Sequence, residues 1–320
     1  MKFLAINVRF KGQVQRYNRH EVIKMVFLKQ IELPDQYEEE KILSSELRTC
    51  FNGVYPFRIF PRKHLQFIDF APITLLYGGN GSGKTTLLNV IAEKIGAIRH
   101  SEYSKSAFFD RYIAPCEIYG DEIPEINQML SSDDVFDYVL NIRYLNNGID
   151  EHREQLFKGY TTMKRGIQEG NDELLRLHGL DDYDRWKEHY DAISKTQSTF
   201  VKERLARNID MNSNGETAMR YFTDHIDSNA IYLIDEPENS LSVQFQTELA
   251  KYIEDSARFY NCQFIISTHS PIFLAMKDAK IYDLDSCPAR TKKWTDLTNV
   301  RKYFEFFESH REEFLLTNGD

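Results

Sequence analysis

Residues 78–85 read GGNGSGKT and have the types and spacing of a loop that holds phosphate groups. In such a loop the glycines let backbone N–H groups converge on phosphate oxygens, and the following helix adds the positive end of its dipole. Lys84 is expected to neutralise the β and γ phosphates, and the Thr85 hydroxyl to ligate Mg²⁺. We therefore predict that one run of residues holds a nucleotide: Gly78, Asn80, Gly81, Ser82, Gly83, Lys84, Thr85 and Thr86.

Two adjacent carboxylates, Asp235 and Glu236, follow the apolar run IYLI. An ionised carboxylate at the end of a buried strand is costly unless a cation or hydrogen bonds meet it. Asp235 is therefore expected to bind Mg²⁺ together with Thr85. Glu236 is placed to take a proton from the water that attacks the γ phosphate. The alternative is a pair of exposed carboxylates that open a turn, and the phosphate loop disfavours it.

His269 lies just past a further apolar run, QFIIST, and follows the acidic pair by 33 residues. A lone histidine is usually structural, but α/β proteins bind their ligands at the ends of strands. A neutral imidazole that donates a hydrogen bond to the γ phosphate would report whether that phosphate is present. We predict this catalytic role for His269.

A fourth polar stretch, SNGE at 213–216, lies shortly before the strand that ends in the acidic pair. As four residues it is a weak pattern, and it also fits a helix start with Ser213 as the N-cap. Its position makes Ser213, Gly215 and Glu216 further candidates for nucleotide contact.

Runs with strand character surround these motifs and indicate the fold class. Helical segments separate them, and this alternation predicts an α/β fold with a largely parallel central sheet. The stretch LPDQYEEEKILSSEL is expected to be a polar connection. The runs are KFLAINVRF, VIKMVFLKQIEL and LQFIDFAPITLLYG before the phosphate loop, and AIYLIDEPE, CQFIISTHS and AKIYDLD near the end.

The middle of the chain, from 100 to 212, has little strand signal and many charged residues. Ser131 and Asp134 resemble a capping box that opens a helix over VFDYVLNIRYL. A helical subdomain packed on the sheet is the favoured interpretation, and an arm that docks a partner is the alternative.

We divide the chain into a β-rich phosphate-loop half (1–99), a mainly helical insertion (100–212) and a second half of the core (213–320). One amphipathic face is expected from the spacing of Trp186, Tyr190, Ile193, Gln197, Phe200 and Leu205.

Composition excludes several classes of protein. The chain has 320 residues and is 42% hydrophobic and 28% charged, as expected of a globular protein. No apolar run is long enough to span a membrane, so we expect a cytoplasmic protein. The four cysteines are far apart, which indicates neither zinc nor disulfides. The net charge of −9 does not support nucleic acid as a partner, although it leaves a local basic groove open.

In this order, the phosphate loop, SNGE, LIDEPENSLS and STHS resemble the ATP-binding cassette (ABC) ATPases. The SxGE form of the signature element is similar to that of soluble SMC-like and RecF-like members. The segment from STHSP to IYDLD resembles compact bacterial AAA-type ATPases. The similarity covers most of the chain, with the insertion as its least certain part.

This resemblance implies a head-to-tail homodimer with two ATP molecules at its interface. Each site would combine the phosphate loop of one subunit with Ser213 and Gly215 of the other, and 240–242 would form a loop that contacts the partner. The family's glutamine loop has only Gln128 as a candidate. Adenine stacking cannot be assigned, although three aromatic residues precede the phosphate loop, Tyr55, Phe57 and Phe60. The insertion lacks the long heptad arms of SMC proteins, which disfavours DNA bridging.

The function predicted from these features is that of a soluble ABC-type ATPase with ATP and Mg²⁺ as its ligands. It would regulate or power a partner, such as a nuclease effector in bacterial anti-phage defence or DNA maintenance. The alternative is the nucleotide-binding subunit of an ABC transporter, which the signature form and the large insertion disfavour. Glu236 and His269 argue against a scaffold that binds ATP without hydrolysing it.

Overall fold

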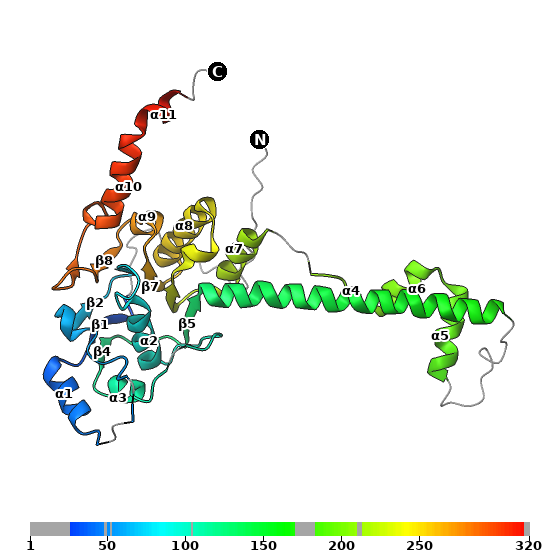
Figure 1. The fold of residues 1–320 in the computed structure, drawn as a ribbon, viewed down its shortest axis with the longest axis horizontal. Helices are drawn as coiled ribbons and strands as arrows, with labels where there is room; N and C mark the ends of the chain where they lie inside the picture. Colours follow the sequence, from blue (N-terminus) through cyan, green and yellow to red (C-terminus); the bar gives the residue numbers. More distant parts are fainter. Residues whose placement is uncertain are drawn as a thin grey trace.

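The computed structural model describes residues 26–47, 50–51, 53–103, 105–169, 183–209 and 213–316. The strand expected in KFLAINVRF lies outside these residues. Figure 1 shows a sheet-centred body from which one long helix extends.

A six-stranded sheet lies at the centre of the body, in the order β5-β6-β7-β3-β8-β9. Its first five strands are parallel, and only β9 runs antiparallel to its neighbour. Parallel strands that are covered on both faces consist of nearly continuous apolar residues. Most strands of this sheet could therefore be predicted from the sequence. The predicted α/β class is thus confirmed. The bounds are β3 Ile73–Tyr77, β5 Ile126–Ser131, β6 Ala230–Asp235, β7 Cys262–Thr268, β8 Lys280–Asp283 and β9 Arg290–Thr291.

Two strands, β4 (Glu117–Gly120) and β5, fall where the sequence showed little strand signal. The expectation was wrong here for a physical reason. Within INQMLS, Asn127 and Gln128 interrupt the apolar run, because β5 is an edge strand. The insertion becomes continuously helical only at α4 (Ser132–Gln168), after the short helix α3 and these two strands.

A smaller antiparallel sheet packs beside the first, in the order β2-β1-β4, with β1 at Leu28–Glu32 and β2 at Phe67–Asp69. The fully buried side chain of Gln263 in β7 joins the two sheets. Its amide oxygen accepts from Leu28 N at 2.8 Å, and its amide nitrogen donates to Leu28 O at 2.8 Å. A buried side chain thus replaces the backbone partners that Leu28 would otherwise lack.

Helices cover both faces of the large sheet (Figure 1). On one face, α2 (Lys84–Ile95) and the small sheet form a common apolar core with alternate residues of the strands, such as Leu233 and Ile265. On the other face lie α7 (Asn214–His225), α8 (Val243–Phe259) and α9 (Pro271–Leu274). Because both faces of the sheet are covered, the ends of the central strands are the place where loops can form a site.

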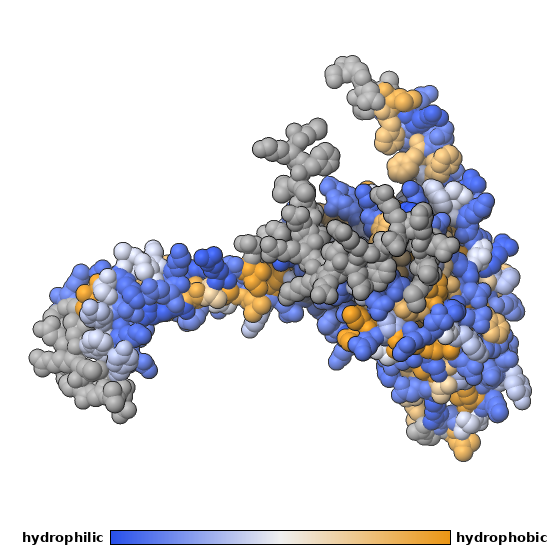
Figure 2. All heavy atoms as spheres, turned by 180° about the vertical axis from the view of Figure 1, so that it is seen from behind, coloured by the Kyte–Doolittle hydropathy of each residue, from blue (hydrophilic) through white to orange (hydrophobic). Residues whose placement is uncertain are grey.

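Four further helices of the body lie outside these layers. The polar connection contains α1 (Gln36–Ser44), which Asp35 and Glu38 cap reciprocally, and α3 is Phe109–Ile113. At the end of the chain, α10 (Thr298–Ser309) and α11 (Arg311–Leu316) project from the body. Figure 2 shows apolar side chains on this projection, and the exposed ones are Tyr303, Phe304, Phe306, Phe307, Phe314 and Leu315.

The helix α4 extends from the body and carries α5 (Tyr183–Ser194) and α6 (Gln197–Arg204) at its far end (Figure 1). The predicted capping box is present, because Asp134 Oδ2 accepts from Ser131 N at 2.7 Å and Asp134 N donates to Ser131 Oγ at 3.1 Å. The far helices pack on α4 around a small core of their own, so the interpretation of a subdomain packed on the sheet was wrong.

The single amphipathic face expected for 186–205 is also absent. Thr196 caps α6 and separates it from α5, so the helical spacing does not continue between them. Phe200 is fully buried, whereas 52% of Tyr190 is exposed. Within the described residues, no helix is both long and apolar enough to cross a membrane.

Replacing Gln263 by Leu should lower the free energy of unfolding by about 2–4 kcal/mol, because it leaves two buried backbone groups of Leu28 without partners. Urea denaturation followed by circular dichroism measures the change. The control is Gln36→Leu, on the exposed surface of α1. If Gln263→Leu were as stable as this control, the amide would not be needed to join the sheets.

Candidate functional site

The carboxyl ends of β6, β7 and β3 meet at one edge of the large sheet. In register, Asp235 lies opposite Ser267, and Thr268 lies opposite Tyr77. The phosphate loop follows Tyr77 directly, and His269 follows Thr268. Three of the four predicted motifs, far apart in the sequence, are therefore brought together by strand pairing.

The phosphate loop has the backbone that its glycines permit. Gly81 and Gly83 have φ angles of 79° and 94°, in the left-handed region that side chains rarely adopt. A Cβ at Gly78 would lie 2.5 Å from Ser82 Oγ, and one at Gly83 would lie 3.0 Å from an Ile59 methyl carbon. The loop can thus curl tightly into the N-terminus of α2, where the N–H groups of the first turn have no helical acceptor.

Lys84 is held over this loop. Its Nζ donates to Gly78 O at 2.7 Å and to Gly79 O at 3.2 Å, and it lies 3.1 Å from Glu236 Oε1. Only 4% of the side chain is exposed, so a buried ammonium is matched by several acceptors. The cation is fixed between the loop and the end of β6.

Asp235 and Thr85 form the predicted pair of oxygen donors. Thr85 Oγ1 donates to Asp235 Oδ1 at 3.1 Å, and Ser267 Oγ donates to the same oxygen. Burial raises the pKa of Asp235, although these hydrogen bonds oppose the shift. A desolvated carboxylate beside a hydroxyl fits Mg²⁺, which takes hard oxygen ligands and keeps several waters. The described residues contain no group of three or more His, Cys, Asp or Glu arranged for a metal.

Glu236 has an unusual backbone for a residue other than glycine, with φ at 45°. Such strain persists where the surroundings fix it, commonly at functional sites. Its N–H donates to Ser267 O at 3.1 Å, and its carbonyl accepts from Ser132 Oγ. Asn239 Nδ2 donates to Glu236 Oε2 at 3.1 Å, while Oε1 faces Lys84. The carboxylate is therefore directed at the phosphate loop.

Two side chains at the site were missed by sequence reasoning. Asp285 follows β8 and accepts from Gly79 N, at 2.9 Å to Oδ2 and 3.1 Å to Oδ1. Glu238 contacts His269, with its Oε1 3.2 Å from His269 Nδ1. The signal for Asp285 was available, since IYDLD is a further apolar run that ends in acids beside β3.

The SNGE element has a local explanation in this fold. Ser213 caps α7, and Glu216 completes a capping box with it. A Cβ at Gly215 would lie 2.8 Å from Phe245 Cδ2, so α7 and α8 need a glycine for their close approach. Among the described residues, no hydrogen bond joins Ser213, Gly215 or Glu216 to the phosphate loop of the same chain. The structure therefore does not bring the fourth motif together with the other three.

The remaining candidates are placed as follows. Gln128 pairs with Tyr232, three positions before the level of Asp235, so it lies away from the strand ends and is not suited to a glutamine loop. Phe57 and Phe60 are buried in the core and cannot stack on a base. Tyr55 is half-buried, and its hydroxyl donates to Thr86 Oγ1 at 3.2 Å.

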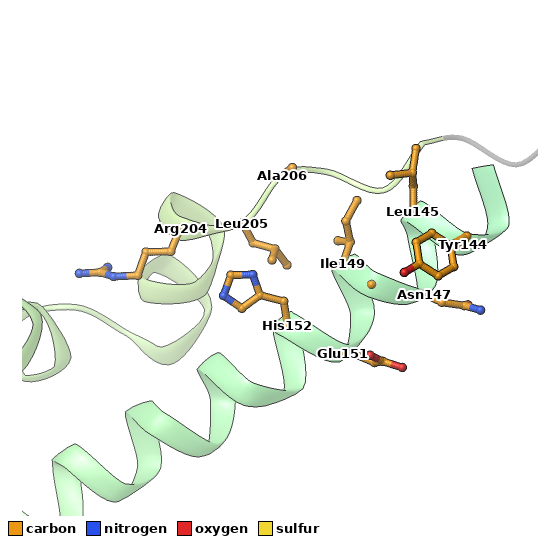
Figure 3. A pocket seen from close by; sticks show the side chains of 10 residues that line it. Tyr144, Leu145, Asn147, Ile149, Glu151, His152, Arg204, Leu205 and Ala206 are labelled. Carbon is orange, nitrogen blue, oxygen red and sulfur yellow. The ribbon is translucent and has the colours of Figure 1, made fainter. Parts of the chain in front are cut away.

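The helix α4, together with α5 and α6 at its far end, forms an arm. A separate cavity of about 540 Å³ lies on this arm. Figure 3 shows it between α4 and the segment after α6, lined by side chains that include Tyr144, Ile149, His152 and Leu205. None of its lining residues belongs to the phosphate loop or to the acidic pair. It takes no part in the chemistry described above.

Two segments of the chain match models of known families. Residues 56–93, which contain the phosphate loop and most of α2, match an AAA domain. Residues 200–274, which include SNGE, the acidic pair and His269, match an AAA ATPase domain. The three motifs that the strand pairing brings together all lie within these two matched segments. Both matches are to AAA-type ATPase domains, which supports the predicted P-loop ATPase.

Solved structures similar to this chain include SMC heads and a transporter. The Smc head domain of Pyrococcus furiosus, with an extended coiled coil and bound to the C-terminal domain of ScpA, is 13% identical over 89% of this chain and 99% of that chain, with a TM-score of 0.41. The SMC head of Thermotoga maritima is 12% identical over 84% and 99%, with a TM-score of 0.37. A chain described as a metal-chelate type ABC transporter, in an inward-facing conformation, is 15% identical over 85% and 86%, with a TM-score of 0.37. No curated protein matches the chain.

Proposed function

We propose that this ATPase hydrolyses ATP to ADP and phosphate with Mg²⁺, and that hydrolysis controls the association of two copies. The observation that supports the chemistry best is a continuous cluster at the strand ends. Lys84 lies 3.1 Å from Glu236, and Thr85 lies 3.1 Å from the neighbouring Asp235. A cation, a metal-binding pair and a carboxylate thus face the loop that would hold the phosphates.

Each residue then has a distinct task. Thr85 and Asp235 would hold Mg²⁺, which offsets the negative charge of the phosphates. Lys84 would exchange its carboxylate partner for phosphate oxygens and stabilise the charge that develops on the γ phosphate. Glu236, released from Lys84 and still held by Asn239, would accept the proton of the attacking water.

Glu236→Gln keeps the shape of the side chain but removes the proton acceptor. We expect it to bind ATP like the parent and to lower kcat by roughly 10²–10⁴-fold, the usual contribution of a positioned base. Lys84→Ala should instead lose ATP affinity, because the phosphates lose their fixed cation. Titration calorimetry and phosphate release measure the two effects, with Glu248→Gln on the exposed face of α8 as the control. Near-normal turnover in Glu236→Gln would assign the base to another residue.

The proposed dimer rests on the place of SNGE. Within one chain this element lies apart from the phosphate loop, at the exposed N-terminus of α7. A helix N-terminus presents unpaired N–H groups that suit a phosphate. In a two-fold dimer, Ser213 of one copy could meet the γ phosphate held by the other, which creates two equivalent composite sites. ATP would join the copies, and its hydrolysis would release them.

Ser213→Arg should leave ATP binding to a single copy intact and prevent ATP-dependent dimerisation, measured by light scattering in the Glu236→Gln background. Because Ser213 also caps α7, the loss of a cap costs about 1 kcal/mol by itself. Thr196→Arg, which removes the cap of α6 on the arm, is the matched control. Normal dimerisation of Ser213→Arg protein would contradict a role of SNGE across the dimer and would leave only its role as the cap of α7.

Mixing Ser213→Arg with Lys84→Ala protein sharpens this test. One composite site of the mixed dimer would carry both changes, and the other would carry neither. ATPase activity of the mixture should therefore exceed that of either variant alone, provided one intact site suffices for turnover.

We propose that ATP binding and hydrolysis act, by way of the arm, on a partner protein. Such a partner could be a nuclease effector in anti-phage defence or DNA maintenance. Two contacts support this route. The first residue of α4, Ser132, hydrogen-bonds the carbonyl of Glu236, and Arg143 of α4 donates to Asn214 of α7 at 2.8 Å. The arm is thus tied both to the hydrolytic residue and to the SNGE helix.

Affinity purification of Glu236→Gln protein in ATP should retain a partner that Lys84→Ala protein does not retain, because only the first variant holds ATP. Mass spectrometry and nucleic-acid staining identify what is bound. An effector such as a nuclease would agree with the proposal. A membrane permease would favour the transporter alternative and contradict it.

A further inference from the structure

The carboxylate of Asp285 holds the second residue of the phosphate loop. It follows β8, which pairs with β3 in parallel, so it lies beside the point where the loop begins. Both of its oxygens accept from Gly79 N, Oδ2 at 2.9 Å and Oδ1 at 3.1 Å. A hydrogen bond to an ionised acceptor is stronger than one between neutral groups. The loop is thus fixed by a residue that is 206 positions away in the sequence.

Gly79 also closes the turn of the loop. Its carbonyl oxygen accepts from Ser82 N at 3.1 Å, and Gly81, with φ at 79°, has the left-handed backbone that such a turn requires at its third residue. The same oxygen accepts from Lys84 Nζ at 3.2 Å. Glycine loses more conformational freedom on ordering than any other residue. A contact that orders Gly79 before ATP arrives therefore lowers the entropy cost of binding.

The position of Asp285 is set by the hairpin of β8 and β9. Asp285 N donates to Asp283 Oδ1 at 2.9 Å, and Lys292 Nζ donates to Asp283 Oδ2 at 2.6 Å. Only 4% of the Asp283 side chain is exposed, so solvent screens this ion pair weakly. Between the two acids, Leu284 N donates to Tyr77 O at 2.8 Å, directly before the phosphate loop. A continuous chain of hydrogen bonds therefore runs from the hairpin to the loop.

Two effects of Asp285 on ATP binding have opposite signs. A carboxylate beside the loop repels phosphate groups, and its removal would then tighten binding. Its hydrogen bonds to Gly79 order the loop, and their removal would weaken binding. Asp285 is exposed, and water and salt reduce the repulsion between exposed charges. The hydrogen bonds act directly on the loop, so we expect the ordering to exceed the repulsion.

We propose that Asp285 is a positioning residue, which holds Gly79 N–H so that the phosphate loop has its binding form before ATP arrives. The inference rests on the proposed function and deepens it, because it adds a residue that prepares the loop for the nucleotide. Asp285 acts through Gly79 in this role and contacts no phosphate. It should therefore govern the affinity for ATP and leave the chemical step, which we assign to Glu236, nearly unchanged.

Asp285→Ala and Asp285→Asn separate the hydrogen bonds from the charge. Alanine offers no acceptor, whereas the amide oxygen of asparagine can still accept from Gly79 N without a negative charge. With Mg²⁺ present, Asp285→Ala should raise the KM for ATP and the dissociation constant of AMPPNP by roughly tenfold, as expected when a charge-assisted hydrogen bond is lost. We expect kcat to stay near that of the parent, and Asp285→Asn to recover most of the lost affinity. Phosphate release and titration calorimetry measure these quantities.

The control is Asp255→Ala, which removes an exposed carboxylate from α8 and should bind ATP like the parent. The thermal unfolding midpoints of both alanine variants should lie close together. Unchanged or tighter binding of AMPPNP by Asp285→Ala would overturn the proposal. So would an Asp285→Asn variant that binds as weakly as Asp285→Ala, because an acceptor for Gly79 N would then not be what matters. A fall in kcat with an unchanged KM would place Asp285 in the chemical step and contradict a positioning role.

The contact can also be observed without nucleotide, in spectra of the full chain labelled with ¹⁵N-glycine. Gly79→Ala identifies the Gly79 signal, since a Cβ there would lie 3.7 Å from Asp285 Oδ2, which is an ordinary contact distance. Its amide proton should resonate downfield in the parent and move upfield in Asp285→Ala, because the carboxylate acceptor is lost. A signal that Asp285→Ala leaves in place would contradict the hydrogen bond.

Failure of this inference can be told from failure of the proposed function. If the parent protein neither bound AMPPNP nor hydrolysed ATP, the proposed function itself would fail. If the parent did both and Asp285→Ala matched it in KM and in AMPPNP affinity, only the role of Asp285 would fail.

Discussion

A buried carboxylate at the end of β6 is the constraint around which the site is arranged. Asp235 is desolvated, and its charge is met by the hydroxyls of Thr85 and Ser267. Ser267 lies opposite it because β6 and β7 pair in that register. Thr85 reaches it because β3 lies on the other side of β7 and the phosphate loop returns toward the sheet. A shift in either register would separate an acid from its donors in the core.

The same strand ends connect the chemistry to the rest of the molecule. The strained backbone of Glu236 is fixed by Ser267 on one side and by Ser132, the first residue of the arm, on the other. Two residues later, Glu238 turns back to the His269 loop. Single hydrogen bonds therefore link the turn after β6 to the arm and to the His269 loop.

Much of this arrangement could be predicted from local signals in the sequence. The phosphate loop, the acidic pair and His269 each follow a continuous apolar run, and parallel strands place such positions together. The cap at Ser131 was predictable because its partner is three residues away. The edge strand β5 was missed because polar residues interrupt it, and the projecting arm because helical periodicity does not say what a helix packs against.

The contacts that were missed join residues distant in the sequence. Gln263 meets Leu28, Asp285 meets Gly79 and Glu238 meets His269 only after the sheet has formed. For SNGE the structure explains the serine and the glycine by capping and packing within one chain. A role of SNGE across a dimer depends on where a second copy binds. The sequence of one chain does not specify that position.

The most direct measurement of the central claim is a crystal structure of the Glu236→Gln protein with ATP and Mg²⁺. We expect the triphosphate along residues 78–86, Mg²⁺ beside Thr85 and Asp235, and Lys84 moved from residue 236 to the γ phosphate. A nucleotide bound elsewhere, or Lys84 unmoved beside an empty loop at saturating ATP, would contradict the account.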